Sequence, residues 1–366
     1  MAAAKLILPG KLGNPEGLLV DDIRLDPRIK KVMANMPEGS PADGMPQLNV
    51  SSSYADSLRW VGEMENMLAS QDQAVSASMP DFPGVFSRKE VIKGVDQNDI
   101  DLHIEEPRGE LRSQDEIPCI VHLHGGGMVM TTAQASTSRR WRRSLAQQGV
   151  IVVGVEFRNG AGALGNHPFP AGLTDCASAV RWVHEHRSEL GISSIVVTGE
   201  SGGGNLAVAT AVKANLEGWV NEIDGVFAIA PMIFGYYGTV PPELLSWREN
   251  EGYEGTLAMT RAMARVYDPE SEHEYDPMAW PYHATNDQLE GLPPHIITNY
   301  ELDLIRDDGA FFARKLQAAG VSAISRTITG ATHVVDLVMP DLFPELLDET
   351  INSLVGFARR LGDVHG

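Results

Sequence analysis

One stretch constrains the fold of this chain more than any other, and it lies at residues 195–207. It reads Ile-Val-Val-Thr-Gly-Glu-Ser-Gly-Gly-Gly-Asn-Leu-Ala, a β-branched run, then a glycine-flanked serine, then helix-forming residues. This order predicts a strand, a sharp turn and a helix, with Ser201 in the turn. Gly199 and Gly203 suit such a turn because residues without a Cβ can crowd together in it. The pattern is typical of a serine nucleophile, but a helix N-cap serine after a glycine turn fits it as well.

The rest of the chain alternates between strand-like and helix-like stretches. Apolar β-branched runs are separated by longer helical runs from residue 117 onward, and 86–105 alternates like a pair of antiparallel edge strands. This order predicts an α/β fold with a mostly parallel sheet and helices on both of its faces. The predicted strands are 90–94, 100–104, 117–123, 150–157, 195–198, 225–230, 295–300 and 321–329, and the predicted helices are 139–147, 173–189, 205–216, 308–319 and 343–360.

Two segments break the alternation. Residues 1–85 mix short helical patches, such as 54–68, with prolines and glycines, and residues 234–282 are rich in prolines, aromatics and acidic side chains. The chain is therefore divided into an N-terminal segment (1–85), a core in two parts (86–233 and 283–366) and an insertion (234–282). A serine at the edge of a parallel sheet faces water unless something covers it, so we expect these two segments to pack on each other above Ser201 as a helical cap. A detachable tail or an oligomer arm is the alternative for residues 1–85.

A glycine-rich loop directly follows the apolar strand 117–123. It reads His122-Leu-His-Gly-Gly-Gly-Met128, and its three successive glycines leave backbone N–H groups that no side chain shields. Such a loop can donate hydrogen bonds to an oxyanion, although a flexible turn fits the pattern too. The two histidines alone make a weak zinc site, because no third ligand stands nearby.

A carboxylate and a histidine follow later in the chain, each just past a predicted strand. Asp303 lies closest to the end of strand 295–300, whereas Asp307 and Asp308 suit the N-terminus of the next helix. His333 follows strand 321–329, while His295 opens a strand and His365 lies at the terminus. Open α/β sheets place their sites at the carboxyl ends of the strands, so Asp303 and His333 are the residues placed to act with Ser201.

These motifs together resemble the bacterial hormone-sensitive-lipase family of α/β-hydrolases. The resemblance covers roughly residues 85–360, and within the family it is greatest to the members typified by brefeldin A esterase. Three departures stand out: the serine is flanked by Glu200 and Gly202 in place of the usual aspartate and alanine, Leu304 replaces the proline after Asp303, and the glycine-rich stretch 159–165 replaces a proline-rich one. The motifs that carry the resemblance are His124-Gly-Gly-Gly127, Gly199-Glu-Ser-Gly-Gly-Gly-Asn-Leu-Ala207, Asp276-Pro-Met-Ala-Trp-Pro-Tyr282, Asn299-Tyr-Glu-Leu-Asp-Leu-Ile-Arg-Asp307 and His333.

The resemblance implies a serine carboxylesterase that acts on carboxylic esters with short to medium acyl chains or on lactones. Ser201 would be the nucleophile, His333 the base and Asp303 the group that orients the base; the N–H groups of Gly126, Gly127 and Gly202 would form the oxyanion hole. No metal or organic cofactor is expected. An amidase or acyltransferase with the same triad and a non-catalytic ligand-binding protein of this fold remain alternatives. In the insertion, five side chains are expected either to hold the cap together or to line an acyl pocket: Tyr236, Tyr237, Trp247, Met259 and Met263.

Charge and composition limit the classes of partner that the protein can bind. The net charge of −20 disfavours nucleic acid and anionic membranes, so the basic run 139–143 is interpreted as a solvated helix face with a packed Trp141. Cys119 and Cys176 lie in apolar runs and are expected to be buried free thiols. No window is apolar enough to span a membrane, and the N-terminus lacks a signal-peptide pattern, so we expect a cytoplasmic protein. A small-molecule ester is the expected partner, and a homodimer is left open.

A nucleotide site is the main competing interpretation. Residues 160–165 and 202–207 match Gly-x-Gly-x-x-Gly/Ala patterns. Pro168 and Pro170 follow the first match where a helix would have to continue, and Asp224 after the second match precedes its strand instead of ending it. Neither match therefore predicts a dinucleotide site, and no P-loop pattern is present.

Overall fold

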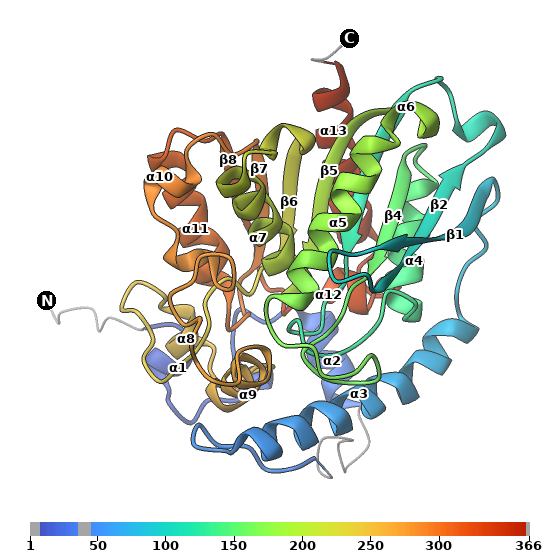
Figure 1. Ribbon diagram of the computed structural model, residues 1–366. Coiled ribbons are helices and arrows are strands. Elements are labelled where there is room, and N and C mark those ends of the chain that lie inside the picture. Colours follow the sequence, from blue (N-terminus) through green and yellow to red (C-terminus); the bar gives the residue numbers. More distant parts are fainter. Residues whose placement is uncertain (1–7, 36–44, 364–366) are drawn as a thin grey trace, which may run out of the picture.

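The computed structural model describes residues 8–35 and 45–363 and has the α/β architecture that the alternation predicts (Figure 1). Its sheet has eight strands in the order β1-β2-β4-β3-β5-β6-β7-β8. β2 runs antiparallel to both of its neighbours, and all other pairs from β4 to β8 are parallel. The strands are β1 (Val85–Lys93), β2 (Asp99–Pro107), β3 (Ile117–Leu123), β4 (Ile151–Glu156), β5 (Ile192–Glu200), β6 (Gly225–Ile229), β7 (His295–Tyr300) and β8 (Ala323–Ile328).

Helices cover both faces of the sheet. Successive residues of a strand face opposite sides, so Cys119 and Val121 of β3 join one apolar cluster while Ile120 joins the other. The first cluster is covered by α5 (Ala171–Glu185), α7 (Gly202–Glu217) and α11 (Arg306–Ala318), and the second by α4 (Ser136–Ala146) and α13 (Pro344–Asp363). Burial on both faces explains why the central strands read as continuous apolar runs.

The remaining elements are short, apart from one long helix in the N-terminal segment. The N-terminal segment contains α1 (Gly10–Gly13), η1 (Leu19–Asp21), α2 (Pro27–Ala34) and α3 (Tyr54–Ala77). The stretch between β6 and β7 contains α8 (Ser246–Glu249), α9 (Leu257–Tyr267), η5 (Pro281–His283) and α10 (Asn286–Leu289). The core also holds η3 (Gly109–Leu111), α6 (Arg187–Leu190), η4 (Val220–Glu222) and α12 (Val335–Val338).

The N-terminal segment and the insertion lie together at one end of the sheet. Helix α3 contacts α9, and α1 contacts α8, below the strands in Figure 1. Local sequence sets where these helices begin: Thr256 caps α9 by accepting the N–H of Met259, and Asp26 caps α2 with Pro27 at its first position. The glycine stretch 160–165 faces α3, where the Glu65 carboxylate accepts the N–H of Ala163 at 2.6 Å. A carboxylate of this chain therefore occupies one backbone donor that a phosphate would need.

The structure corrects several details of the sequence analysis. The basic run 139–143 is not a solvated face throughout, because Arg142 is fully buried and donates to the carbonyl of Ala133 at 2.6 Å. Gly154 on β4 leaves the space for it, since a Cβ there would lie 2.6 Å from Arg142 Cδ. The predicted helix 173–189 ends at Glu185, and β5 is five residues longer than predicted. Trp141, Cys119 and Cys176 are buried as expected, and both cysteines are free.

Candidate active site

Ser201 occupies a strained turn between β5 and α7. Its backbone has φ 57° and ψ −118°, a conformation that side-chain-bearing residues rarely adopt and that is typical of functional sites. The flanking glycines are required by space: a Cβ on Gly199 would lie 2.3 Å from the carbonyl oxygen of Gly203, and a Cβ on Gly203 would lie 2.0 Å from that of Leu123. The turn therefore has the geometry of a nucleophile elbow and not of an ordinary capped helix start.

Asp303 and His333 are brought together from two neighbouring loops. Asp303 follows β7 and His333 follows β8, and Asp303 Oδ2 lies 2.6 Å from His333 Nδ1. The other carboxylate oxygen accepts the N–H of Ile305 at 3.1 Å, so the buried carboxylate is held from both sides. Contact with Asp303 leaves the proton on Nδ1 and the Nε2 lone pair available to act as a base.

The charge around His333 favours its protonated form. Burial disfavours the imidazolium, but the carboxylates of Asp303, Glu254 and Glu200 together offset it, so the pKa of His333 lies above its usual value. The backbone N–H of His333 also donates to Glu254 of the insertion at 3.0 Å. Ser201 and His333, both within the described ranges, form no hydrogen bond with each other in this structure, as is common for catalytic groups before substrate binds.

The glycine loop after β3 lies directly against the elbow. A Cβ on Gly202 would lie 2.6 Å from the backbone nitrogens of Gly127 and Met128, so the two main chains touch. Gly126, Gly127 and Met128 all have positive φ values of 114°, 61° and 61°. Within residues 8–35 and 45–363, the N–H groups of Gly126, Gly127 and Gly202 have no hydrogen-bond acceptor. Free backbone donors of this kind can stabilise an oxyanion.

Glu200 fixes the position of that loop, a role that the sequence analysis missed. Its carboxylate accepts the N–H of Gly125 at 2.8 Å and lies 2.9 Å from His122 Nε2. Burial works against the charged form, but His122 beside it lowers the pKa of Glu200 below its usual value. In the sequence, Glu200 stood out only as a departure from the usual aspartate. The glycine loop that it holds lies about 75 residues earlier in the chain, so no local pattern linked the two.

The two histidines of the loop are structural in this arrangement. His122 pairs with Glu200, and His124 stacks on Phe157 with its Nδ1 2.7 Å from the carbonyl oxygen of Gly125. Across the part of the chain that the structure describes, no three His, Cys, Asp or Glu side chains gather in a way that could hold a metal ion.

The insertion covers this site. Met263 of α9 lies over the glycine loop, where a Cβ on Gly127 would come within 2.5 Å of its sulfur. Asp308, expected only to start a helix, is buried and accepts the N–H groups of Ile233 and Phe234 and the indole N–H of Trp247. Burial raises the pKa of Asp308 above its usual range, and the hydrogen bonds from Trp247 and Phe234 oppose that effect. Trp247 therefore joins the insertion to the core, whereas Met263 reaches the glycine loop.

Comparisons with known proteins agree with this fold. A family model described as alpha/beta hydrolase fold matches residues 120–337. Carboxylesterase NlhH of Mycobacterium tuberculosis is 33% identical over 219 residues, which are 57% of this chain and 63% of that protein, so the match spans less than two thirds of it.

Two solved structures match nearly the whole chain. One is described as brefeldin A esterase, a bacterial homologue of human hormone-sensitive lipase; it is 38% identical with a TM-score of 0.88, over 98% of this chain and 100% of that one. The other, esterase Est22, is 32% identical with a TM-score of 0.80, over 93% and 98% of the two chains. The resemblance that the motifs indicated is thereby confirmed, and it extends into the N-terminal segment.

Proposed function

Since the chain belongs to the α/β-hydrolase family, among the bacterial homologues of hormone-sensitive lipase, we propose that it is a carboxylesterase that works through an acyl-enzyme on Ser201. The observation that carries the proposal is the pairing of His333 Nδ1 with the buried Asp303 carboxylate at 2.6 Å, at the same edge of the sheet as the strained Ser201 turn. A general base needs such a pairing to orient its imidazole, whereas a ligand-binding protein does not.

The reaction proceeds in two halves. Ser201 Oγ attacks the ester carbonyl carbon while His333 Nε2 takes its proton, and the carbonyl oxygen becomes an oxyanion facing the N–H groups of Gly126, Gly127 and Gly202. The C–O bond to the alcohol then breaks, and His333 returns the proton to the leaving oxygen. Water repeats the same steps on the acyl-enzyme, releasing the acid and restoring Ser201.

The cap supports a small substrate held beside the glycine loop. Met263 lies over Gly127, and its helix α9 contacts α3. A side chain this close to the oxyanion donors suits short to medium acyl chains or lactones. The named esterases among the relatives favour an ester over an amide, although the same triad serves an amidase or acyltransferase. In the described residues, no helix is both long enough and apolar enough to cross a membrane.

The test is hydrolysis of a p-nitrophenyl ester series in buffer that contains a chelator, with the Ser201→Ala variant beside the wild type. We expect turnover by the wild type and a loss of at least about 10⁴-fold in the variant. Full activity in a folded Ser201→Ala variant would remove the nucleophile assignment. Amide and alcohol-acceptor substrates in the same assay separate esterase from amidase and acyltransferase activity.

A further inference from the structure

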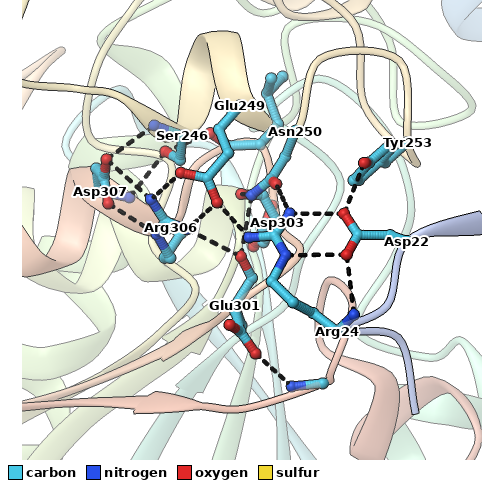
Figure 2. Close-up of polar contacts among 12 residues, drawn as sticks. Asp22, Arg24, Ser246, Glu249, Asn250, Tyr253, Glu301, Asp303, Arg306 and Asp307 are labelled. Atoms are coloured by element: carbon cyan, nitrogen blue, oxygen red, sulfur yellow. Dashed lines mark hydrogen bonds and ion pairs between the residues drawn. The ribbon is translucent and has the colours of Figure 1, made fainter. Parts of the chain in front are cut away.

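The loop that carries Asp303 is held by a residue of the insertion. Asn250 follows α8, is fully buried, and donates through Nδ2 to the carbonyl oxygens of Asp303 at 2.8 Å and Glu301 at 3.0 Å (Figure 2). Both acceptors are backbone carbonyls of the loop that carries Asp303, one at Asp303 itself and one at Glu301. Two hydrogen bonds from outside the loop therefore constrain its backbone.

Asn250 is in turn held by the N-terminal segment. Its side-chain oxygen accepts from Arg24 Nη2 at 3.3 Å, and Arg24 also pairs with Asp22 at 2.7 Å and with Glu249. Figure 2 shows Arg24 reaching between Asp22 and the insertion residues. Because the donors and acceptors of this mostly buried group satisfy one another, moving one of them disturbs the rest.

A second arginine closes the network on the far side of the loop. Arg306 pairs with Glu249 at 2.9 Å and with Asp307 at 2.8 Å, and it donates to the carbonyl oxygen of Glu301 at 3.1 Å. Ser246 of α8 adds a hydrogen bond from its hydroxyl to the carbonyl oxygen of Leu304 at 2.8 Å. Residues 301–306, the loop that carries Asp303, are called the acid loop. The insertion contacts both of its ends.

The same network reaches the histidine loop. The Glu301 carboxylate accepts the N–H of Gly330 at 2.7 Å, and the carbonyl oxygen of Gly330 accepts the N–H of Asp26 at 3.0 Å. Leu302 donates its N–H to the carbonyl oxygen of Ala331 at 3.0 Å. The N-terminal segment therefore contacts the loop before His333 directly, through Asp26, and reaches the loop that carries Asp303 through Asn250 and Glu249.

We infer that Asn250, supported by the Arg24–Glu249–Arg306 ion pairs, is a positioning residue that sets the Asp303 carboxylate on His333. The cap of this protein therefore contributes to turnover as well as to the choice of substrate. The inference rests on the proposed function, because the value of the placement lies in the catalytic use of His333. Misplacing a catalytic group by about 1 Å can cost on the order of 10²-fold in rate.

The test is the Asn250→Ala variant, measured for kcat, KM and the pH dependence of kcat/KM. We expect kcat to fall by about 10- to 100-fold with little change in KM. The acidic limb of the kcat/KM–pH profile should also move to lower pH. The Asp303 carboxylate helps to raise the pKa of His333, so displacing that carboxylate lowers this pKa. The other charged groups facing His333 are Glu254 and Glu200, and neither is altered by the variant.

A matched control separates positioning from stability. Thr260 is also a buried polar residue of the insertion, but its hydroxyl bonds only to carbonyls of its own helix region, those of Thr256 and Leu257. We expect Thr260→Val to lower the melting temperature without moving the acidic limb. If Asn250→Ala fails to fold, Arg24→Gln takes its place, with a smaller fall in kcat and a shift of the limb in the same direction.

A readout that needs no substrate keeps this inference separate from the proposed function. The proton shared by His333 Nδ1 and Asp303 should give a low-field NMR resonance in the wild type and in Thr260→Val, and a weakened one in Asn250→Ala. A folded Asn250→Ala variant with unchanged kcat, acidic limb and resonance would overturn the inference. Full esterase activity in Ser201→Ala would instead overturn the proposed function and leave the NMR result standing.

Discussion

At the scale of single residues, the site depends on the Ser201 hydroxyl and on free backbone N–H groups that an unusual main-chain conformation holds in place. Ser201 takes a strained conformation in a turn between β5 and α7 that is so tight that no Cβ would fit at Gly199 or Gly203. Glu200, the next residue in the chain, uses its carboxylate to hold the glycine loop at Gly125. The nucleophile and the loop of free N–H groups are therefore positioned by the same five residues of the elbow.

The first residue-scale prediction concerns pH. We expect kcat/KM to rise with pH as His333 loses its proton, with a midpoint above about 6.5, since the pKa of His333 is raised from its ordinary value. Asp303→Asn should lower kcat by roughly 10⁴-fold through the wrong imidazole tautomer. Asp341→Asn, which removes a surface carboxylate paired with Arg140, is the control and should change neither quantity. A flat profile from about pH 5 to 8 would rule out a histidine base.

The second residue-scale prediction concerns the contact between the elbow and the glycine loop. The Cβ of Gly202→Ala would lie 2.6 Å from the backbone nitrogens of Gly127 and Met128. The loop must shift to admit it, so we expect kcat to fall with little change in KM. Gly62→Ala in α3 is the matched control, because its Cβ meets nothing within 4 Å. Equal activity of the two variants in the p-nitrophenyl ester assay would show that the loop adapts freely.

At the scale of elements, the start of α11 joins the cap to the core. Asp308 in its first turn accepts N–H groups from Ile233 and Phe234, which follow β6, and the indole N–H of Trp247 from α8. One buried carboxylate thus connects three parts of the chain that are distant in sequence. The sequence pattern indicated only a helix start at this position.

This connection gives the element-scale prediction. Asp308→Asn replaces one acceptor oxygen with an amide that donates, so at least one buried N–H loses its partner, and we expect the free energy of unfolding to fall by about 1–3 kcal/mol. Asp287→Asn, an exposed acidic residue in the first turn of α10, should stay within about 0.5 kcal/mol of the wild type. Denaturant melts of both variants check the difference. Small and equal changes would mean that Asp308 does no more than start its helix.

At the scale of the whole molecule, the N-terminal segment is part of the fold. Leu19, Leu25 and Ile29 are buried in the same apolar cluster as α4 and α13, and Arg24 joins the network on the acid loop. A detachable tail would leave such side chains exposed. The prediction that residues 1–85 and 234–282 pack on each other agrees with the contact between α3 and α9, whereas their control over substrate choice stays a prediction. Residues 1–7 and 36–44 of that segment lie outside the described residues.

Removing residues 1–45 tests that control. We expect a lower melting temperature from the exposed apolar surface, together with a changed preference along an acyl-length series. Arg24→Gln in the full-length chain is the comparison, and it should lower kcat by a similar factor for every ester. If the truncated protein folds and keeps the acyl-length preference of the wild type, the N-terminal segment does not control substrate choice, and its role is confined to packing and to positioning Asp303.

The strands and site residues that the sequence predicted are those with a local sequence pattern. The central strands, such as 117–123 and 295–300, are buried on both faces, so their apolar runs mark them directly. Ser201, Asp303 and His333 were predicted because each follows the end of a predicted strand in the order typical of α/β-hydrolases, and the structure pairs Asp303 with His333. The buried Arg142 depends on the missing side chain of Gly154, and the role of Asn250 depends on carbonyls about 50 residues away. Contacts of that kind leave no local pattern.

The most direct test of the central claim is to locate the covalent adduct. The wild type is treated with an organophosphate, digested and examined by peptide mass spectrometry, with Ser201→Ala as the control. We expect one adduct per chain on the peptide that contains Ser201, formed as esterase activity is lost, and no adduct on that peptide in the variant. Loss of activity with the adduct on another residue, or full activity with Ser201 modified, would contradict an acyl-enzyme at this serine.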